Sequence, residues 1–283
     1  MLNHGLIIGL GEVLWDMLPQ GRQLGGAPTN FAYHVSQFGF QGVVVSAIGN
    51  DYLGTEILNQ LAIHNITSCI ATVDKPTGVV NVVLDAKGIP TYEIVENVAW
   101  DNIPYNEEIQ KLATQARAVC FGTLAQRSNI SRSTITQFIE SLSPKCLKVF
   151  DINLRQHYYN REIIDWSLSH CDILKLNKEE LLVLKEMFNA SSIDDASFCA
   201  KLQQLYNLKI IIVTCGSNGS YVYNDNDVNY EETPSVEVVD TIGAGDSFTA
   251  AFVATLLKGK PIIEAHQQAI IISASTCTHK GAI

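Results

Sequence analysis

The 283-residue sequence predicts an α/β protein with a doubly wound, mostly parallel sheet that is flanked by helices and carries a small β-sheet lid. Two observations lead to this prediction. Short β-branched runs alternate with amphipathic stretches along most of the chain, as in βαβ units. Between residues 67 and 97, three β-like segments follow one another without helices between them, which indicates a separate small sheet.

The first half of the chain gives these elements in order. The run GLIIGLGEVLWD at 5–16 predicts the first strand, with Asp16 at its end, 28–38 has helical spacing, 42–49 is again strand-like, and 52–64 predicts a helix. TSCIATV, TGVVNVVLD and PTYEIVE then predict three strands that are separated by the turns DKP and AKG. The lid is expected to be discontinuous, and to take residues 12–24 as well as 67–100.

From about residue 106 the helix and strand patterns alternate again. The strand-like segments are nearly continuous apolar runs, as parallel strands covered on both faces must be. The predicted order is NEEIQKLATQA, AVCFGT, SRSTITQFIESL, KVFDIN, EIIDWSLSH, DILKLN, KEELLVLKEM, DASFCAKLQQLYN and KIIIVTCG. Ligands are expected outside the carboxyl ends of these strands.

The composition indicates one domain over residues 1–283, with 47% apolar and 17% charged residues. A net charge of -10 argues against nucleic acid or an anionic membrane as a partner. Seven cysteines without a CxxC pair predict reduced core residues. The N-terminus lacks the basic region of a signal peptide, and no run reaches about 18 apolar residues, so the expected location is the cytoplasm.

DTIGAGDSF at 240–248 leads into an apolar stretch with helical spacing. The loop therefore opens a helix, and the amides of Gly243, Ala244, Gly245 and Asp246 are helix-start donors that can bind an anion. Asp246 has two interpretations. It either stabilises the helix N-terminus, or it is a general base that takes the proton from a substrate hydroxyl while the amides hold a phosphoryl group.

This loop resembles the DTxGAGD motif of the sugar kinases grouped with ribokinase, also called the PfkB family. LGGAPTNFA at 24–32 and GNDYLG at 49–54 resemble the N-terminal signature of the same family, in the expected order. The resemblance covers nearly the whole chain. It implies a carbohydrate kinase in which Asp246 is the base and Gly243, Ala244 and Gly245 form the anion hole.

The resemblance also implies the residues that contact the sugar, which are Asp16, Gly26, Asn30 and Asn153. Read without the resemblance, Asp16 could equally be a turn or cap carboxylate. DINLR at 151–155 follows a strand and sends polar groups to the ligand edge. Arg155 there is expected to hold phosphoryl or sugar oxygens, and its alternative is a surface ion pair.

On the nucleotide side, the implied residues are Asn177, Thr214, Gly216, Gly219 and Ser275. Magnesium is expected to arrive with ATP and to be held by Glu180 through water, although by its spacing alone Glu180 is a first-turn helix acid. Lys175 lies on the same strand face as Asn177 and is expected to help hold phosphate. The histidines show no HxxxH spacing, so no zinc or iron site held by the protein is expected.

Family members also imply a potassium-like monovalent cation, here beside Asp240 and Ile242. The sequence ends at Ile283, soon after the GA at 281–282. We therefore expect part of the segment that encloses this cation, and part of the outer wall of the adenine pocket, to be absent.

The motifs GEVLWDMLP, GGAPTNFA, AWDNIP and DINLR look most like the bacterial fructokinase branch, which implies fructose as the acceptor. Ribose, 2-keto-3-deoxygluconate and a nucleoside are the alternatives. Only Lys75 and Lys87 lie within 67–98, which favours a neutral sugar. Trp100 is either a sugar contact or an apolar anchor of the lid.

Two other protein classes stay open. One is a non-catalytic sugar sensor on the same fold, and the other is a Rossmann dehydrogenase, for which GLGEV lacks the third glycine. A homodimer through the lid is the expected assembly.

Overall fold

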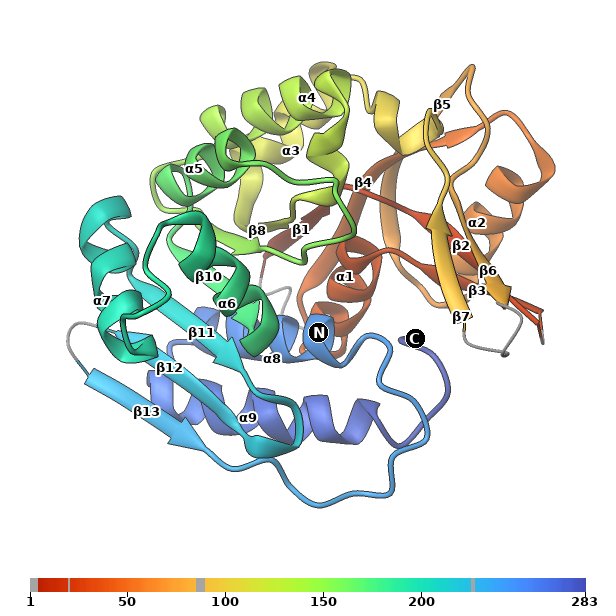
Figure 1. The fold of residues 1–283 in the computed structure, drawn as a ribbon. Coiled ribbons are helices and arrows are strands. Elements are labelled where there is room, and N and C mark those ends of the chain that lie inside the picture. Colours follow the sequence, from red (N-terminus) through yellow and green to blue (C-terminus); the bar gives the residue numbers. More distant parts are fainter. Residues whose placement is uncertain (1–4, 20, 85–89, 225–226) are drawn as a thin grey trace.

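The computed structural model describes residues 5–19, 21–84, 90–224 and 227–283. A nine-stranded sheet lies between two layers of helices, and a four-stranded small sheet is placed beside it (Figure 1). This architecture confirms the predicted fold class. Among the described residues, no helix combines the length and hydropathy that crossing a membrane requires.

The strands of the large sheet run parallel from β11 to β5, and β12 and β13 are antiparallel additions at one edge. Their spatial order is β13 (Asp227–Glu231), β12 (Ser220–Asn224), β11 (Ile210–Thr214), β10 (Ile173–Asn177), β9 (Leu147–Asp151), β8 (Ala116–Phe121), β1 (Leu6–Leu10), β4 (Gln41–Gly49) and β5 (Thr67–Val73).

Both faces of this sheet are covered. Ile7 belongs to the apolar cluster on one face and its neighbour Ile8 to the cluster on the other, because successive side chains of a strand point in opposite directions. One face packs against α1 (Ala27–Gln37), α2 (Tyr52–Ile63), α8 (Ala244–Leu257) and α9 (Ile262–Thr276). The other packs against α3 (Glu107–Gln115), α4 (Asn129–Glu140), α5 (Arg161–Ser169), α6 (Lys178–Met187) and α7 (Asp195–Tyr206).

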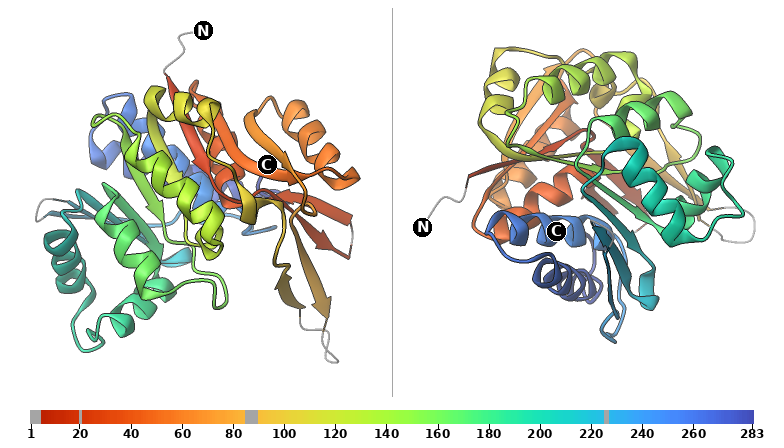
Figure 2. Two further views of the ribbon diagram at one scale, coloured as in Figure 1. Left: turned by 90° about the horizontal axis from the view of Figure 1, so that it is seen from above. Right: turned by 90° about the vertical axis from the view of Figure 1, so that its left-hand side faces the viewer.

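The small sheet has the order β3 (Gly21–Gly25), β2 (Leu14–Leu18), β6 (Val79–Leu84) and β7 (Pro90–Ile94), so it combines two separate parts of the chain. It lies on the opposite side of the molecule from β13 and α7 (Figures 1 and 2). Short 3-10 helices follow some of the strands: η1 (Ala99–Asn102) comes after β7, η2 (Leu124–Arg127) after β8 and η3 (Gly216–Asn218) after β11.

The expectation that residues 67–73 belong to the lid was wrong. These residues form β5, which pairs in parallel with β4 over seven residue pairs at the edge of the large sheet. In this edge strand only Cys69 is buried, so its pattern is as polar as that of a hairpin strand. The turn at 74–76 therefore crosses between the two sheets. The predicted AKG turn at 86–88, with Lys87, lies outside the described residues.

Candidate active site

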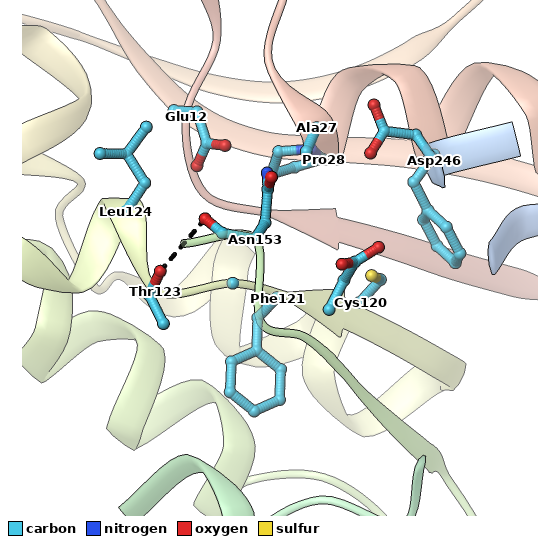
Figure 3. A pocket seen from close by; sticks show the side chains of 12 residues that line it. Glu12, Ala27, Pro28, Cys120, Phe121, Thr123, Leu124, Asn153 and Asp246 are labelled. Atoms are coloured by element: carbon cyan, nitrogen blue, oxygen red, sulfur yellow. Dashed lines mark hydrogen bonds between the residues drawn. The ribbon is translucent and has the colours of Figure 1, made fainter. Parts of the chain in front are cut away.

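The parallel strands bring their carboxyl ends to one edge, where the chain leaves β1, β8 and β9. A pocket opens there, and in the view of Figure 3 Glu12 and Asp246 lie on opposite sides of it with Asn153 between them. Its lining comes from five parts of the chain and consists of Glu12, Ala27, Pro28, Phe31, Cys120, Phe121, Gly122, Thr123, Leu124, Asp151, Asn153 and Asp246.

Asp246 lies in the first turn of α8, which begins after Gly243 in the left-handed conformation, at φ 77°. Asn30 Nδ2 donates a hydrogen bond to Asp246 Oδ2 over 2.7 Å. Burial, helped by the negative charge of Asp151, raises the pKa of Asp246 to about 6, although the hydrogen bond from Asn30 opposes this rise. The carboxyl group is therefore set for proton transfer near neutral pH.

The start of α8 has the donors of an anion hole. No side chain caps the helix, and the Ala244 amide donates to the Thr241 carbonyl over 3.3 Å, so the amides of Gly245 and Asp246 are left for another acceptor. A Cβ on Gly245 would lie 2.8 Å from Lys175 Nζ, which shows how closely the lysine approaches the helix start. A cation beside the positive end of a helix favours an anion between them.

Lys175 reaches this position because β10 pairs with β9 in register, opposite Asp151. Both side chains are buried, and Lys175 Nζ lies 3.1 Å from Asp151 Oδ1. Burial disfavours the charged lysine, but Asp151 and the other nearby carboxylates outweigh it and raise the pKa of Lys175. Thr249 Oγ1 donates to the second oxygen of Asp151 over 3.0 Å. The predicted phosphate contact of Lys175 therefore fits its place in the fold.

The predicted sugar contacts lie on the other side of Asp246. Asp16 was expected at the end of the first strand, but that strand ends at Leu10 and Asp16 lies on β2 of the small sheet. Burial raises its pKa to about 6, against the opposing charge of Arg155. Gly26 has φ 111°, and a Cβ there would lie 2.4 Å from the carbonyl oxygen of Glu12, so the backbones touch. Asn30 Oδ1 is buried and has no partner among the described residues. A buried acceptor in this state favours a hydroxyl donor from a ligand.

Glu12 is a pocket residue that the sequence analysis did not identify. It is 4% exposed, and burial raises its pKa to about 7, with a smaller contribution from the negative charge of Asp246. The backbone amides of Glu12 itself and of Ala27, at the start of α1, oppose this rise in pKa. An acidic residue directly after the first apolar strand was the signal that could have identified it.

Asn153 and Arg155 follow β9. The backbone at Asn153 is left-handed, at φ 42°, and Thr123 Oγ1 donates to its carbonyl over 3.4 Å. Arg155 is exposed, and its positive charge opposes the raised pKa values of Asp16, Glu12 and Asp246. The charge of Arg155 therefore acts on all three carboxyl groups, and no ion pair of the described residues holds it elsewhere.

On the nucleotide side, Asn177 and Thr214 are neighbours at the ends of β10 and β11. Glu180 forms a capping box with Asn177, since Glu180 Oε2 accepts from the Asn177 amide over 2.7 Å. Glu180 Oε1 accepts from the Leu154 amide over 2.8 Å. Glu180 is therefore a first-turn acid that caps α6. Its contact with magnesium through water stays a prediction.

The remaining predicted residues lie in the turn after β11, near the end of α9 and in the loop before α8. Gly216 and Gly219 have φ 57° and 88° in the turn after β11, and Ser275 is exposed near the end of α9. Asp240 Oδ2 accepts from the Gly281 amide over 3.0 Å, and Ile242 is 37% exposed. Residues 281–282 therefore lie against the DTIGAGD loop.

Comparison with known proteins identifies relatives along the whole chain. The model of the pfkB family of carbohydrate kinases matches residues 20–283. A fructokinase of Klebsiella pneumoniae is 30% identical over 89% of this chain and 85% of its own length. An ATP-dependent 6-phosphofructokinase of Thermoanaerobacterium thermosaccharolyticum is 27% identical over 98% of this chain and 89% of its own.

A solved structure has the same fold. It is that of an uncharacterized sugar kinase from Pyrococcus horikoshii in complex with ATP, which superimposes with a TM-score of 0.81 at 25% identity. The superposition covers 98% of this chain and 93% of that one.

Proposed function

The chain belongs to the pfkB family of carbohydrate kinases, and from this premise we propose that it transfers the γ-phosphoryl group of ATP to a primary hydroxyl of a furanose. Fructose, giving fructose 6-phosphate, is the acceptor that we favour. The observation that carries the proposal is the buried Asp246 carboxyl, which lies at the start of α8 and is bonded to Asn30. One group thus borders both the anion hole and the predicted sugar contacts.

In the proposed reaction the sugar hydroxyl oxygen forms a bond to the γ-phosphorus, and the bond from that phosphorus to the bridging oxygen of ADP breaks. Asp246 accepts the hydroxyl proton, and the electron pair leaves with ADP. The amides of residues 243–246 and the Lys175 ammonium stabilise the charge on the phosphoryl oxygens as it develops. Asp151 fixes the lysine, because the two side chains form a buried pair.

Magnesium would neutralise the phosphates of the bound nucleotide. Glu180 is the residue that we propose to hold it, through water, because magnesium keeps several of its waters. The carboxylate of Glu180 is already anchored by two backbone amides, so it would present its remaining lone pairs in a fixed direction.

The name of the Klebsiella relative supports fructose, and the unpaired acceptor of Asn30 supports an acceptor that donates a hydroxyl group. The name of the 6-phosphofructokinase relative favours a second acceptor, fructose 6-phosphate, whose added phosphate would need a cation beyond those that the transfer uses. Ribose, 2-keto-3-deoxygluconate and a nucleoside are the further alternatives.

A coupled assay of ADP release tests the proposal over fructose, fructose 6-phosphate, ribose, 2-keto-3-deoxygluconate and adenosine, with and without potassium. We expect ADP release to require the acceptor, and kcat/KM to be highest for fructose. A higher kcat/KM for another acceptor would overturn the choice of fructose, and ADP release with none of them would favour a sugar sensor.

A further inference from the structure

Arg127 lies outside the predicted active site, yet it joins three parts of the chain. It ends η2, and its side chain is 7% exposed. Its Nε and Nη2 atoms donate to the two carboxylate oxygens of Asp101 over 2.8 and 2.9 Å. Nη2 also donates to the Val95 carbonyl over 2.7 Å. Arg127 therefore binds the segment 95–101, through which the chain leaves the small sheet.

Two aromatic rings enclose the guanidinium group. The Arg127 Cζ atom lies 4.0 Å from the centroid of the Trp100 ring and 4.6 Å from that of Tyr158. Cation–π contacts of this kind are strongest when the cation is shielded from water, as this one is. Trp100 belongs to the segment after the small sheet, and Tyr158 to the loop 152–160 after β9. Arg127 thus connects the two.

The loop 152–160 is attached on both sides of Arg155. Before Arg155, the Leu154 amide is bonded to Glu180 of the large sheet's helix layer. After it, Gln156 Nε2 donates to the Tyr92 carbonyl over 2.6 Å, and the Tyr158 hydroxyl donates to the Ile94 carbonyl over 3.2 Å. Arg155 therefore lies where the loop passes from the body of the protein to strand β7 of the small sheet.

From these contacts we infer that Arg127 is a positioning residue, which fixes the loop 152–160 against the exit of the small sheet and so sets where Arg155 reaches the sugar. Arg127 itself is not expected to touch either substrate. Its Asp101 pair anchors it, and its stack with Tyr158 fixes the far end of the loop. The inference rests on the proposed function because it needs Arg155 to act on the sugar side.

Steady-state kinetics of R127K test this inference, with the best acceptor of the wild-type protein. Lysine keeps the charge but cannot bind Asp101 with two parallel donors or stack as a plane between two rings. We expect KM for the sugar to rise by about tenfold to a hundredfold, since small misplacements of a substrate-contacting group have effects of this size. KM for ATP should stay within about twofold of the wild-type value, well below that effect.

R161K is the matched control. Arg161 also pairs with an aspartate, Asp165, over 2.7 Å and stacks on an aromatic ring, Phe188, at 3.8 Å, but it lies on α5, away from the small sheet. It is more exposed than Arg127. We expect R161K to leave both KM values unchanged. Equal effects of the two substitutions on sugar KM would contradict a specific role of Arg127.

Measuring R127K in an Arg155→Ala background distinguishes an effect through Arg155 from a general disturbance of the structure. If Arg127 acts through Arg155, R127K should add less than about threefold to the sugar KM in that background, because residues that act together are not additive. A full additional effect would overturn the inference. If R127K does not fold, Tyr158→Leu tests the same point, since it removes the ring on which Arg127 stacks, together with the hydroxyl bonds to the Ile94 carbonyl and the Glu96 carboxylate. It should also raise the sugar KM and leave that of ATP unchanged.

Hydrogen exchange distinguishes a failure of this inference from a failure of the proposed function, because it needs no activity. In R127K the amides of residues 92–101 and 152–160 should exchange faster together, while those of α8 keep their wild-type rates. Unchanged exchange in both segments of folded R127K would refute the inference, whichever sugar the protein uses.

Discussion

At the scale of single residues, burial makes Asp246 a base of useful strength. An exposed aspartate would be too weak a base at neutral pH to take a proton from a sugar hydroxyl efficiently. Burial at the start of α8, next to Asp151, raises the pKa of Asp246 to about 6. The sequence led us to propose Asp246 as the base, but it could not predict this pKa, because Asp151 is distant in the chain and meets Asp246 only through the sheet.

The pH dependence of kcat/KM follows from this pKa. The base works when it is deprotonated, so activity should fall as pH decreases through about 6, with a limiting slope of one in a logarithmic plot. Above about pH 7 the profile should be level with respect to this group. Initial rates at low sugar concentration between pH 5 and 8 measure it, in roughly half-unit steps around the expected midpoint. A profile that stays level down to pH 5 would contradict the pKa of about 6.

The place of Glu12 in the pocket could not be predicted from its local sequence. The sequence places an acid after the first strand, but a lone glutamate there is equally consistent with a solvated turn. Its burial arises from the approach of Gly26, whose lack of a side chain lets the two backbones touch. Such a contact between two loops leaves no periodic pattern in the sequence.

At the scale of elements, the start of α8 and the end of β10 form the anion site together. The glycines of the DTIGAGD loop predicted the helix start, whereas the place of Lys175 beneath it depends on the register of β10 between β9 and β11. Strand register is set by packing across the sheet, so the sequence could suggest but not fix this contact.

Gly245→Ala tests this pairing of elements. Gly245 needs no special backbone angle, but its added Cβ would meet Lys175 Nζ at 2.8 Å and displace the lysine from the helix start. We expect kcat/KM for ATP to fall by about tenfold to a hundredfold. Gly259→Ala, at the far end of the same helix where a Cβ meets no neighbour, is the control and should affect stability alone. Equal losses of kcat/KM in the two variants would refute the role of this contact.

The assignment of strands to sheets was the main error at this scale. Residues 67–73 were expected in the lid, yet they form β5 of the large sheet. The local pattern of an edge strand does not show which sheet it joins. Pairing with β4 decides it, because α2 returns the chain beside β4 as a parallel crossover.

At the scale of the whole molecule, the candidate active site lies where three units meet. The large sheet supplies Asp151 and Lys175, the helix layer supplies Asn30 and Asp246, and the small sheet supplies Asp16. The fold class was predictable because it follows from the alternation of strands and helices along the chain. The contacts by which Arg127 joins the segment 95–101 to the loop 152–160 were not predictable, because they connect residues from separate parts of the chain.

The central claim is that this assembled site is a sugar kinase with Asp246 as its base, and Asp246→Asn tests it most directly. Folding raises the pKa of this carboxyl from 3.8 to about 6, so the ionised group costs stability at pH above about 6. The asparagine variant should therefore be at least as stable as the wild-type protein at pH 7.5, and melting curves check that it is folded.

The decisive measurement is single-turnover phosphoryl transfer from ATP to the preferred sugar, with nucleotide affinity measured on the same samples. The account predicts a rate that is lower by about 10² to 10⁴ in Asp246→Asn, with unchanged ATP affinity. Transfer at the wild-type rate in the folded variant would contradict it.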